Sequence, residues 1–385
     1  MVADTLVYEN KNQIIRVAGL TDGVLQTLEI ADLSKAAEGN IYLGRISKKV
    51  ELANGKLGYF VNLGEDREAF INAEEHGRDD LNANEGQEVV VQVAQEQRAE
   101  KGARLVRSLQ FVGRFVVYCP YRMNVEVSAK IADKLKADEL KTLVQENTTG
   151  QEGWVVRTSA VYADEAELTT EMENLRAQFD AVRQKAKTSK APALLMARNN
   201  VLSEAISRSG QGLSKIVVND HNLEKDLQEN FAVEYSANPF AEFGLEDAIL
   251  EALQKEVRLK SGGRISIEET RACTAIDVDS GEDDGLGSLG RLNMDAAAEI
   301  ARQIRLRNLS GKIVVDFAGS SEYRYLKSAI EALEEELQHD YIKTSVQGLS
   351  RAGLVEIVRV RRRPSLQDIL STECPTCQGT GRVEK

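Results

Sequence analysis

The chain has 385 residues, of which 42% are hydrophobic and 29% are charged, and its formal net charge is −12 at pH 7. This length is too great for one ordinary hydrophobic core, so we expect several domains. The composition excludes a disordered chain, and no apolar run approaches the roughly 20 residues that span a bilayer. The first residues lack both parts of a signal peptide, so we expect a cytoplasmic protein without a membrane anchor.

The acidic net charge argues against simple phosphate binding, because non-specific affinity for nucleic acids comes mainly from Lys and Arg. This objection weakens if the carboxylates hold cations or if basic residues gather locally, as they do within residues 302–307 and 359–363. A basic run is also typical of a solvated strand edge, so it does not predict a nucleic-acid groove by itself.

Short alternating strands separated by glycine turns predict a small barrel between residues 40 and 106. Strand-like segments on both sides of it are consistent with an insertion into another domain. The aromatic residues Tyr42, Tyr59, Phe60 and Phe70 either stack on bases or pack in the core. Because neighbouring residues of a strand point to opposite faces, at least one of Tyr59 and Phe60 should lie outside the core or at its rim.

Two helical segments follow at residues 129–148 and 163–189, and the strand GWVVRTSAV lies between them. From residue 261 onward, strand-like segments alternate with two strongly amphipathic helices, MDAAAEIARQIRLR and RYLKSAIEALEEELQHD. This alternation predicts a βαβ unit with parallel strands, and therefore an α/β domain.

Asp277 and Asp279 are two residues apart in one predicted strand, and Asp316 lies near the end of the next. If these strands are parallel neighbours, the three carboxylates converge at their carboxyl ends, where open α/β sheets bind ligands. Carboxylate oxygens suit Mg²⁺, which can activate water and neutralise charge on a scissile phosphate. Spacing alone leaves a second interpretation equally open, in which these are solvated carboxylates paired with nearby arginines.

Gly285, Gly287 and Gly290 spell the GxGxxG pattern of dinucleotide-binding loops. In that pattern the first glycine directly follows a strand, whereas here the acidic residues 282–284 intervene and would repel a pyrophosphate. We therefore expect a flexible loop, and a nucleotide-dependent oxidoreductase is a remote alternative.

Cys374 and Cys377 stand at metal-ligand spacing in CPTCQGTG, which is half of a zinc knuckle. Tetrahedral zinc needs four ligands, and Cys119 and Cys273 could supply the other two. A second copy of the same knuckle is simpler, because it gives a symmetric Cys₄ site at a dimer axis. A redox role for CxxC is weaker, since no helix is predicted to follow it.

Segments along almost the whole chain resemble the ribonuclease E/G family, namely NIYLGRI, FVNLGEDREAF, EGQEVVVQV, GWVVRT, SGGRISIEETRACTAIDVDSG, AAAEIARQIRLRNLSGKIVVDF and CPTCQGTG. The resemblance implies a multidomain α/β protein, in which an RNase H-like domain is interrupted by an S1 (OB-fold) barrel. A DNase I-like catalytic domain and a zinc link follow. The implied divisions are the RNase H-like domain at residues 1–37 and 186–258, the S1 domain at 38–107, the 5′ sensor region at 108–185, the catalytic domain at 259–365 and the zinc link at 366–385.

The resemblance also implies a magnesium-dependent endoribonuclease that cuts single-stranded RNA, favours 5′-monophosphorylated ends and acts in RNA processing or decay. Asp277 and Asp316 match the magnesium-binding aspartates of the family, and Asp279 stands beside them as a third catalytic candidate. The remaining matches are Phe60, Phe70 and Lys101 for RNA contacts, Gly113, Val117, Arg157 and Thr158 for the 5′-monophosphate pocket, and Cys374 and Cys377 for zinc shared between two subunits.

The chain departs from the family pattern in ways that affect its expected function. Asp279 stands where the family usually has asparagine, and the acidic loop at residues 281–290 looks shorter. The chain ends soon after the zinc link, without the small domain or degradosome scaffold of other members, so we expect a homodimer. A non-catalytic RNA-binding relative is the competing function, and the acidic charge and Asp279 favour it.

Overall fold

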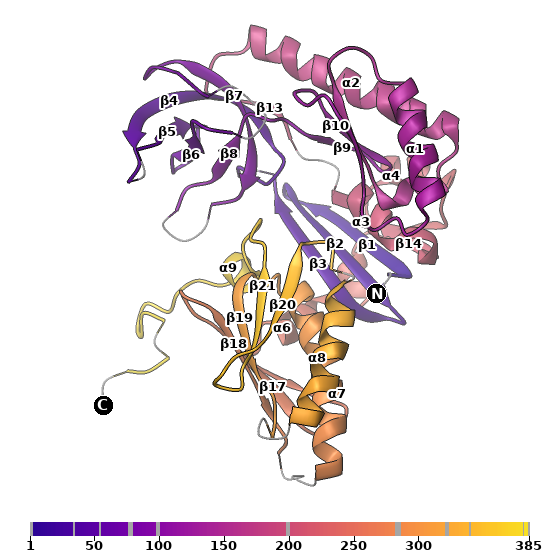
Figure 1. Ribbon diagram of the computed structural model, residues 1–385, viewed down its shortest axis with the longest axis vertical. Helices are drawn as coiled ribbons and strands as arrows, with labels where there is room; N and C mark the ends of the chain where they lie inside the picture. The colour runs from indigo at the N-terminus through magenta and orange to yellow at the C-terminus, as the bar shows by residue number, and fades with distance from the viewer. Residues whose placement is uncertain are drawn as a thin grey trace. The chain divides into compact units, whose positions relative to one another are not determined.

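The computed structural model describes residues 3–33, 35–53, 55–75, 80–97, 101–197, 201–281, 286–319, 323–338, 340–379 and 381–383. The chain divides into two compact units, and Figure 1 labels many of their elements. The N-terminal unit contains residues 2–24 and 29–239, and the C-terminal unit contains residues 25–28 and 240–385. Within the described ranges, no helix combines the length and the apolar character that crossing a membrane requires.

A mixed five-stranded sheet in the order β15-β14-β1-β2-β3 opens the fold. β1 pairs antiparallel with β2 and parallel with β14, so the chain returns to this sheet after the barrel, as an insertion would require. Asn12 and Gln13, with φ of 53° and 64°, form the turn that divides the first strand-like segment into two strands. The elements are β1 (Thr5–Lys11), β2 (Ile14–Thr21), β3 (Val24–Asp32), β14 (Lys215–Val218) and β15 (Val233–Tyr235), with α3 (Val201–Ser209), η2 (Gly210–Gly212) and α4 (His221–Gln228).

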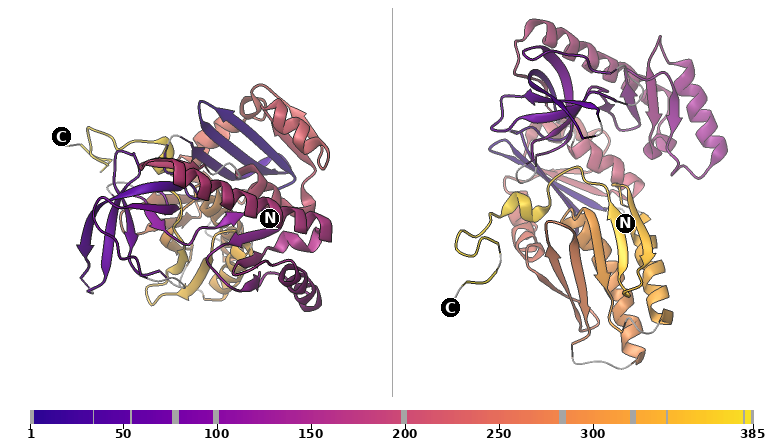
Figure 2. Two further views of the ribbon diagram at one scale, coloured as in Figure 1. Left: turned by 90° about the horizontal axis from the view of Figure 1, so that it is seen from above. Right: turned by 60° about the vertical axis from the view of Figure 1, so that its left-hand side comes forward.

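The predicted barrel is present as five strands in the order β4-β5-β6-β8-β7, closed by pairing of β4 with β7. The right-hand view in Figure 2 shows these strands, in indigo to purple, curling around a common centre. A sixth strand, β13, pairs antiparallel with the first residues of β4, Ile41 to Leu43. The closed barrel is compatible with an S1 or OB-like domain. Its strands are β4 (Ile41–Glu51), β5 (Leu57–Asn62), β6 (Ala69–Asn72), β7 (Glu88–Gln95) and β8 (Arg104–Val106), with β13 at Ala193–Met196.

A smaller sheet in the order β11-β12-β10-β9 follows the barrel and shares a hydrophobic core with two helices. The first helix is shorter than predicted, because the Asp133 side chain accepts the N–H groups of Leu135 and Lys136 and caps it there. The second begins with a capping box formed by Asp164 and Glu167. The elements are β9 (Phe111–Val112), β10 (Val116–Cys119), β11 (Val125–Val127), α1 (Lys134–Glu146), β12 (Gly153–Val156), η1 (Thr158–Tyr162) and α2 (Glu165–Thr188).

The C-terminal unit is built on a six-stranded sheet in the order β16-β17-β18-β19-β21-β20. The predicted βαβ unit is β18, α7 and β19, with β18 and β19 parallel. Figure 1 shows α7 and α8 side by side along this sheet, and their apolar residues form one core with one face of it. The elements are α5 (Pro239–Glu242), α6 (Leu245–Ala252), β16 (Glu256–Arg258), β17 (Arg264–Glu269), β18 (Thr274–Asp279), α7 (Leu286–Leu306), β19 (Gly311–Asp316), α8 (Tyr323–Gln338), β20 (Thr344–Leu349), β21 (Val355–Arg359) and α9 (Leu366–Leu370).

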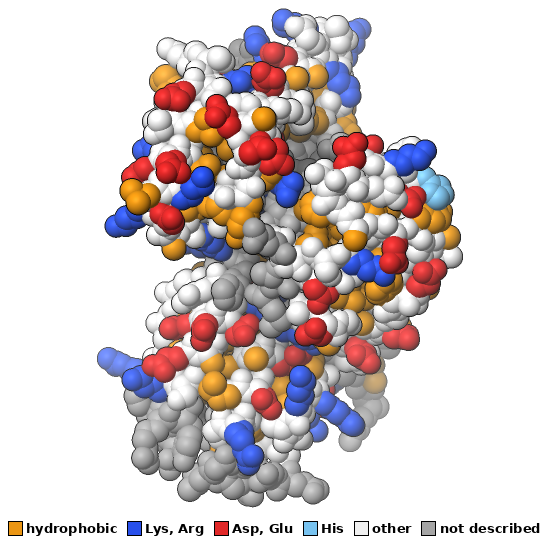
Figure 3. All heavy atoms as spheres, turned by 90° about the vertical axis from the view of Figure 1, so that its right-hand side faces the viewer, with side chains coloured by type: hydrophobic (Ala, Val, Ile, Leu, Met, Phe, Trp, Pro, Cys, Tyr) orange, Lys and Arg blue, Asp and Glu red, His pale blue; other side chains and the backbone are white. Residues whose placement is uncertain are grey.

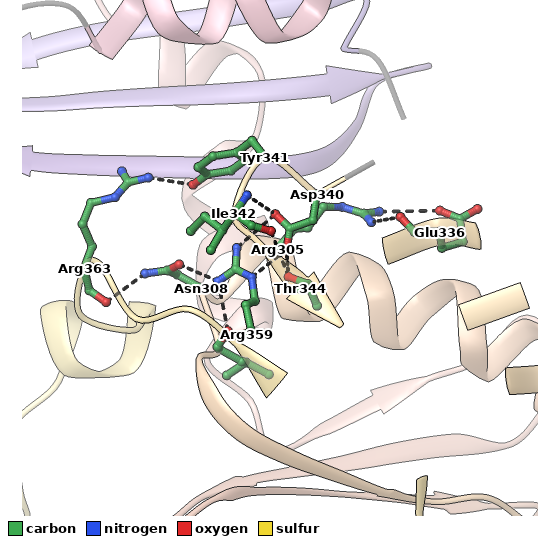
Figure 4. A network of polar contacts seen from close by, with 10 residues as sticks. Arg305, Asn308, Glu336, Asp340, Tyr341, Ile342, Thr344, Arg359 and Arg363 are labelled. Atoms are coloured by element: carbon green, nitrogen blue, oxygen red, sulfur yellow. Dashed lines mark hydrogen bonds and ion pairs between the residues drawn. The ribbon is translucent and has the colours of Figure 1, made fainter. Parts of the chain in front are cut away.

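A buried polar network fixes the end of β21 and the chain that follows it (Figure 4). Arg359 and Asp340 form an ion pair with an Nε–Oδ2 distance of 2.6 Å, and both side chains are 0% exposed. Arg359 also donates to Oδ1 of Asn308 at 2.8 Å. The Asn308 amide in turn donates to the carbonyl oxygens of Arg363 and Pro364. The network therefore ties the C-terminal end of α7 to the segment that leads to α9 and the cysteines.

Candidate active site and RNA-binding surfaces

Asp277 and Asp316 lie directly beside each other on β18 and β19. These strands are parallel neighbours, as predicted, and the two aspartates are partners in their register. Both aspartates are exposed, whereas Ile276 and Val315, their neighbours in the strands, are buried in the core under α7 and α8. Two carboxylates thus lie at the carboxyl ends of parallel strands, on the face of the sheet opposite the helices, which we call the open face.

The negative charges on the open face act on one another. The pKa of Asp277 is raised above its ordinary value, first by partial burial and then by the charges of Asp316 and Asp279, while Arg264 opposes the shift. Charge repulsion of this kind favours either a proton or a bound cation between the carboxylates. The pair is therefore suited to hold a divalent ion.

Asp279 is engaged differently from the other two aspartates. Its carboxylate accepts the N–H of Gly281 at 2.9 Å and an N–H of Arg264, on the neighbouring strand β17, at 2.6 Å. These hydrogen bonds, that of Gly281 first, lower the pKa of Asp279. Convergence of all three carboxylates is not observed, since among the described residues no three or more His, Cys, Asp or Glu side chains form a group that could hold a metal.

The described part of the glycine pattern, residues 286–290, is helical and does not form a phosphate-binding loop. Helix α7 begins at Leu286, so Gly287 and Gly290 lie within a helix, where we had expected a loop. Gly285 and the acidic residues 282–284 lie outside the described residues.

On the barrel, Phe60 and Phe70 form an aromatic pair whose ring centroids are 5.5 Å apart, in an edge-to-face arrangement. Both rings are half-buried, whereas Tyr59 is 0% exposed, so the two neighbours do point to opposite sides. A Cβ at Gly58 would collide with the Phe70 ring, which explains the glycine there. Lys101 is exposed.

Strand register extends this aromatic pair into a row that the sequence did not reveal. Lys48 is the partner of Phe60, Phe60 of Phe70, and Phe70 of Arg104. Directly paired residues point to the same face of a sheet. Two half-buried rings therefore lie between two exposed cations across β4, β5, β6 and β8, and we call these four residues the barrel row.

The four residues expected to recognise a 5′ end lie at the tips of β9, β10 and β12. The Arg157 guanidinium donates to the carbonyl oxygen of Gly113. Val117 pairs with Val155, two residues before Arg157. Thr158 is exposed, and its hydroxyl is 3.2 Å from that of Ser128.

Both positive and negative side chains lie near Arg157 at these strand tips. Burial lowers the pKa of Arg157, while the nearby carboxylates of Glu204 and Glu171 act in the opposite direction. A guanidinium stays protonated at neutral pH despite such a shift. Arg157 therefore offers a cation and Thr158 a neutral donor, which are groups that suit a phosphate. Their contacts lie on opposite sides of β12, that of Arg157 with Gly113 after β9 and that of Thr158 with Ser128 after β11.

Cys374 and Cys377 lie in a tight turn after α9, in which the N–H of Gln378 donates to the carbonyl of Cys374 at 2.8 Å. The N–H groups of Cys377 and Thr376 lower the pKa of the Cys374 thiol, which favours the thiolate that binds metals. Cys119, by contrast, is buried in β10, and burial raises the pKa of its thiol. Of the two pairs of cysteines considered, Cys374 and Cys377 thus have the chemistry of zinc ligands.

The comparisons with known proteins point to one family. The model of the Ribonuclease E/G family matches residues 110–362. Ribonuclease G of Escherichia coli (strain K12) is 32% identical over 421 residues, covering 100% of this chain and 85% of the relative. Ribonuclease G of Haemophilus influenzae is 33% identical over 411 residues, covering 96% of this chain and 82% of the relative. Ribonuclease E of Escherichia coli (strain K12) is 30% identical over 419 residues, covering 98% of this chain and 38% of the relative.

Proposed function

This chain belongs to the Ribonuclease E/G family and is an endoribonuclease, and we propose that it hydrolyses single-stranded RNA with Mg²⁺ held by Asp277 and Asp316. The observation that carries this proposal is the register of β18 and β19, which makes the two exposed aspartates direct partners. The raised pKa of Asp277 supports it, since a cation would relieve the repulsion between the carboxylates.

The donor set fits magnesium, which proteins commonly hold with one or two carboxylates together with water and substrate phosphate. When bound, the ion would activate a water and neutralise charge on the scissile phosphate. Asp277 and Asp316 would be its ligands. We assign Asp279 a supporting role, in which its contacts with Gly281 and Arg264 fix the end of β18 beside the ligands.

For RNA binding we propose the barrel row together with Lys101. Aromatic rings stack on bases without regard to sequence, and flanking cations contact the phosphates of the same strand. The chain carries a net negative charge, so RNA phosphates need cations that are gathered locally. On the face drawn in Figure 3, acidic and basic side chains are intermixed. Phe60 and Phe70 would stack on bases, and Lys48 and Arg104 would hold the phosphates on either side.

We further propose that Gly113, Val117, Arg157 and Thr158 form a pocket that favours RNA with a 5′-monophosphate. Such a pocket would recognise an end of the substrate without taking part in the chemistry. Its support is the contact of Arg157 with Gly113 and the exposed hydroxyl of Thr158, the next residue in the chain.

We propose zinc as a structural metal, held by Cys374 and Cys377 from each of two chains. One chain supplies two thiols at the required spacing, and a closed tetrahedral site needs four ligands. Twofold symmetry would complete the site and make the protein a homodimer.

The finer fold assignments are also proposals. The strand order β15-β14-β1-β2-β3, with β1 to β3 antiparallel and β14 and β15 parallel to β1, favours an RNase H-like domain split by the barrel. The sheet of the C-terminal unit, with helices on one face and carboxylates on the other, is compatible with a DNase I-like catalytic domain. We retain residues 38–107, 108–185, 259–365 and 366–385 as the proposed S1 domain, sensor, catalytic domain and zinc link.

The proposal is tested by incubating a short 5′-monophosphorylated single-stranded RNA with the purified protein, with and without Mg²⁺. Cleavage should require the ion, and Asp316→Asn should abolish it while RNA affinity, measured by fluorescence anisotropy, is retained. Glu356→Gln is a matched control, because this exposed carboxylate lies on the open face opposite Val314. Parental activity in Asp316→Asn, or equal cleavage with and without Mg²⁺, would refute the assigned metal centre.

A further inference from the structure

A carboxylate from helix α2 holds the turn between β9 and β10. The side chain of Glu171 accepts the N–H groups of Arg114, Phe115 and Val116, the latter two at 2.7 and 2.9 Å. One oxygen serves Arg114 and the other serves Phe115 and Val116. Consecutive backbone N–H groups of this kind form a concave anion site, and here its occupant belongs to the protein itself.

The carbonyl groups of the same turn contact the segment that carries Arg157. The carbonyl oxygen of Gly113 accepts the Arg157 guanidinium, and that of Phe115 accepts the Arg157 N–H at 2.8 Å. The carbonyl oxygen of Arg114 accepts the Ser159 hydroxyl at 2.5 Å. The turn is therefore held through its N–H groups by Glu171 and through its carbonyl groups by residues 157–159.

A steric observation links Glu171 independently to Gly113. A Cβ added at Gly113 would lie 2.5 Å from the carboxyl carbon of Glu171, well inside any relaxed contact. The glycine thus leaves room for the carboxylate to reach the three N–H groups. Position 113 and position 171 consequently depend on each other, although they are far apart in sequence.

We propose that Glu171 is a positioning residue for recognition of the RNA 5′ end. This inference rests on the proposed 5′-monophosphate pocket and deepens it. Charge-assisted hydrogen bonds to three N–H groups fix the turn, and so fix Gly113 against Arg157 before RNA arrives. A preorganised pocket avoids the cost of ordering on binding, so Glu171 would raise affinity for the 5′-phosphate without touching it.

Glu171→Gln tests this inference, because it keeps the size and shape of the side chain. One end of the amide is an NH₂ donor, so either orientation sets a donor against at least one backbone N–H of the turn. The quantity measured is the ratio of kcat/KM for a 5′-monophosphorylated RNA to that for the same RNA with a 5′-hydroxyl. We expect the ratio to fall by about tenfold, which corresponds to about 1.4 kcal/mol of differential binding.

The ratio separates positioning from a general structural role. Both RNAs are cleaved by the same preparation, so a smaller folded fraction lowers both rates equally and leaves the ratio unchanged. Glu173→Gln is the matched control, since Glu173 is exposed on the same helix, and it should keep the parental ratio. Glu171→Asp retains the charge but withdraws it by one methylene, so we expect an intermediate ratio.

Two results would overturn the inference in distinguishable ways. If the parental protein and Arg157→Ala both cleave the two RNAs equally well, the 5′-monophosphate pocket is wrong and the role of Glu171 falls with it. If the parental protein prefers the 5′-monophosphate and Glu171→Gln keeps or increases that preference, the pocket stands and the positioning role of Glu171 alone is refuted.

Discussion

Replacement of Asp340 by Asn would remove the counter-charge of Arg359 at a place that water does not reach, since both side chains are 0% exposed. Breaking a buried ion pair by removing one partner typically costs about 3–5 kcal/mol. Arg359 would keep the oxygen of Asn308 and the carbonyl of Leu309 as acceptors, and the new amide offers a third. We therefore expect the lower end of that range, about 3 kcal/mol, for the C-terminal unit.

The loss of stability in Asp340→Asn should be larger at neutral pH than in acid. Burial by itself would raise the pKa of Asp340, but the hydrogen bond and charge of Arg359, with the Ile342 N–H, bring it below its ordinary value. A carboxyl group whose folded pKa is lowered contributes its full stability above the unfolded pKa of about 3.9 and loses it as the pH falls through the folded pKa. Parental protein and Asp340→Asn should therefore differ most near neutral pH and converge in acid.

Hydrogen exchange of the amides in β19 and β21 is the suitable assay, measured at neutral pH over a range of urea concentrations. The single tryptophan, Trp154, lies in the N-terminal unit and does not report on this network. Glu331→Gln is the control, because its partner Lys327 and Glu331 itself are each 63% exposed, and such a pair contributes about 0.5 kcal/mol. If Asp340→Asn costs no more than this control, the buried pair does not stabilise the unit as we infer.

Two further predictions concern RNA binding and the metal of the C-terminal segment. The affinity for RNA falls with salt concentration, and each phosphate contact with a single strand contributes about 0.7 to the steepness of log affinity against log salt. Replacing both Lys48 and Arg104 with alanine should therefore make this slope less steep by about 1.4. Anisotropy at several salt concentrations measures this, and an unchanged slope would exclude them from the RNA path. Changing Cys374 and Cys377 to serine should release zinc and weaken dimerisation. Metal analysis measures the zinc content, and mass measurement in solution reports the dimer. One zinc per monomeric parental chain would contradict the shared site.

Local sequence patterns predicted the candidate active site because its geometry follows from short-range rules. The alternation of residues in a strand predicted that Asp277 and Asp279 share one face, and the βαβ pattern predicted that the two strands are parallel. Pairing with an arginine, the second interpretation of these carboxylates, is what the structure shows for Asp279. Its partner Arg264 could not be predicted, since it depends on the register of β17 against β18. The sequence did not predict β20, because Val346 is the only aliphatic residue among its three half-buried positions and the strand therefore lacks an apolar pattern.

Contacts between distant segments could not be predicted from one sequence. The barrel row depends on an irregularity in β4, where the register shifts between Ile46 and Lys48 and brings Lys48 opposite Phe60. A one-residue change in register would send these side chains to the opposite face. Glu171 likewise contacts a turn more than fifty residues earlier, at a separation of 57 from Arg114. Nothing in the local sequence of α2 distinguishes it from the exposed Glu173.

The net charge of −12 does not by itself decide whether this chain binds RNA, because charge has different effects at the barrel row and on the open face. The barrel row carries its own cations beside the aromatic rings, so its affinity should fall with salt and not require a divalent ion. On the open face the charges of Asp277 and Asp316 oppose an incoming phosphate until a cation neutralises them. Magnesium should consequently be needed for cleavage much more than for binding, which gives the acidic residues a function that the overall charge conceals.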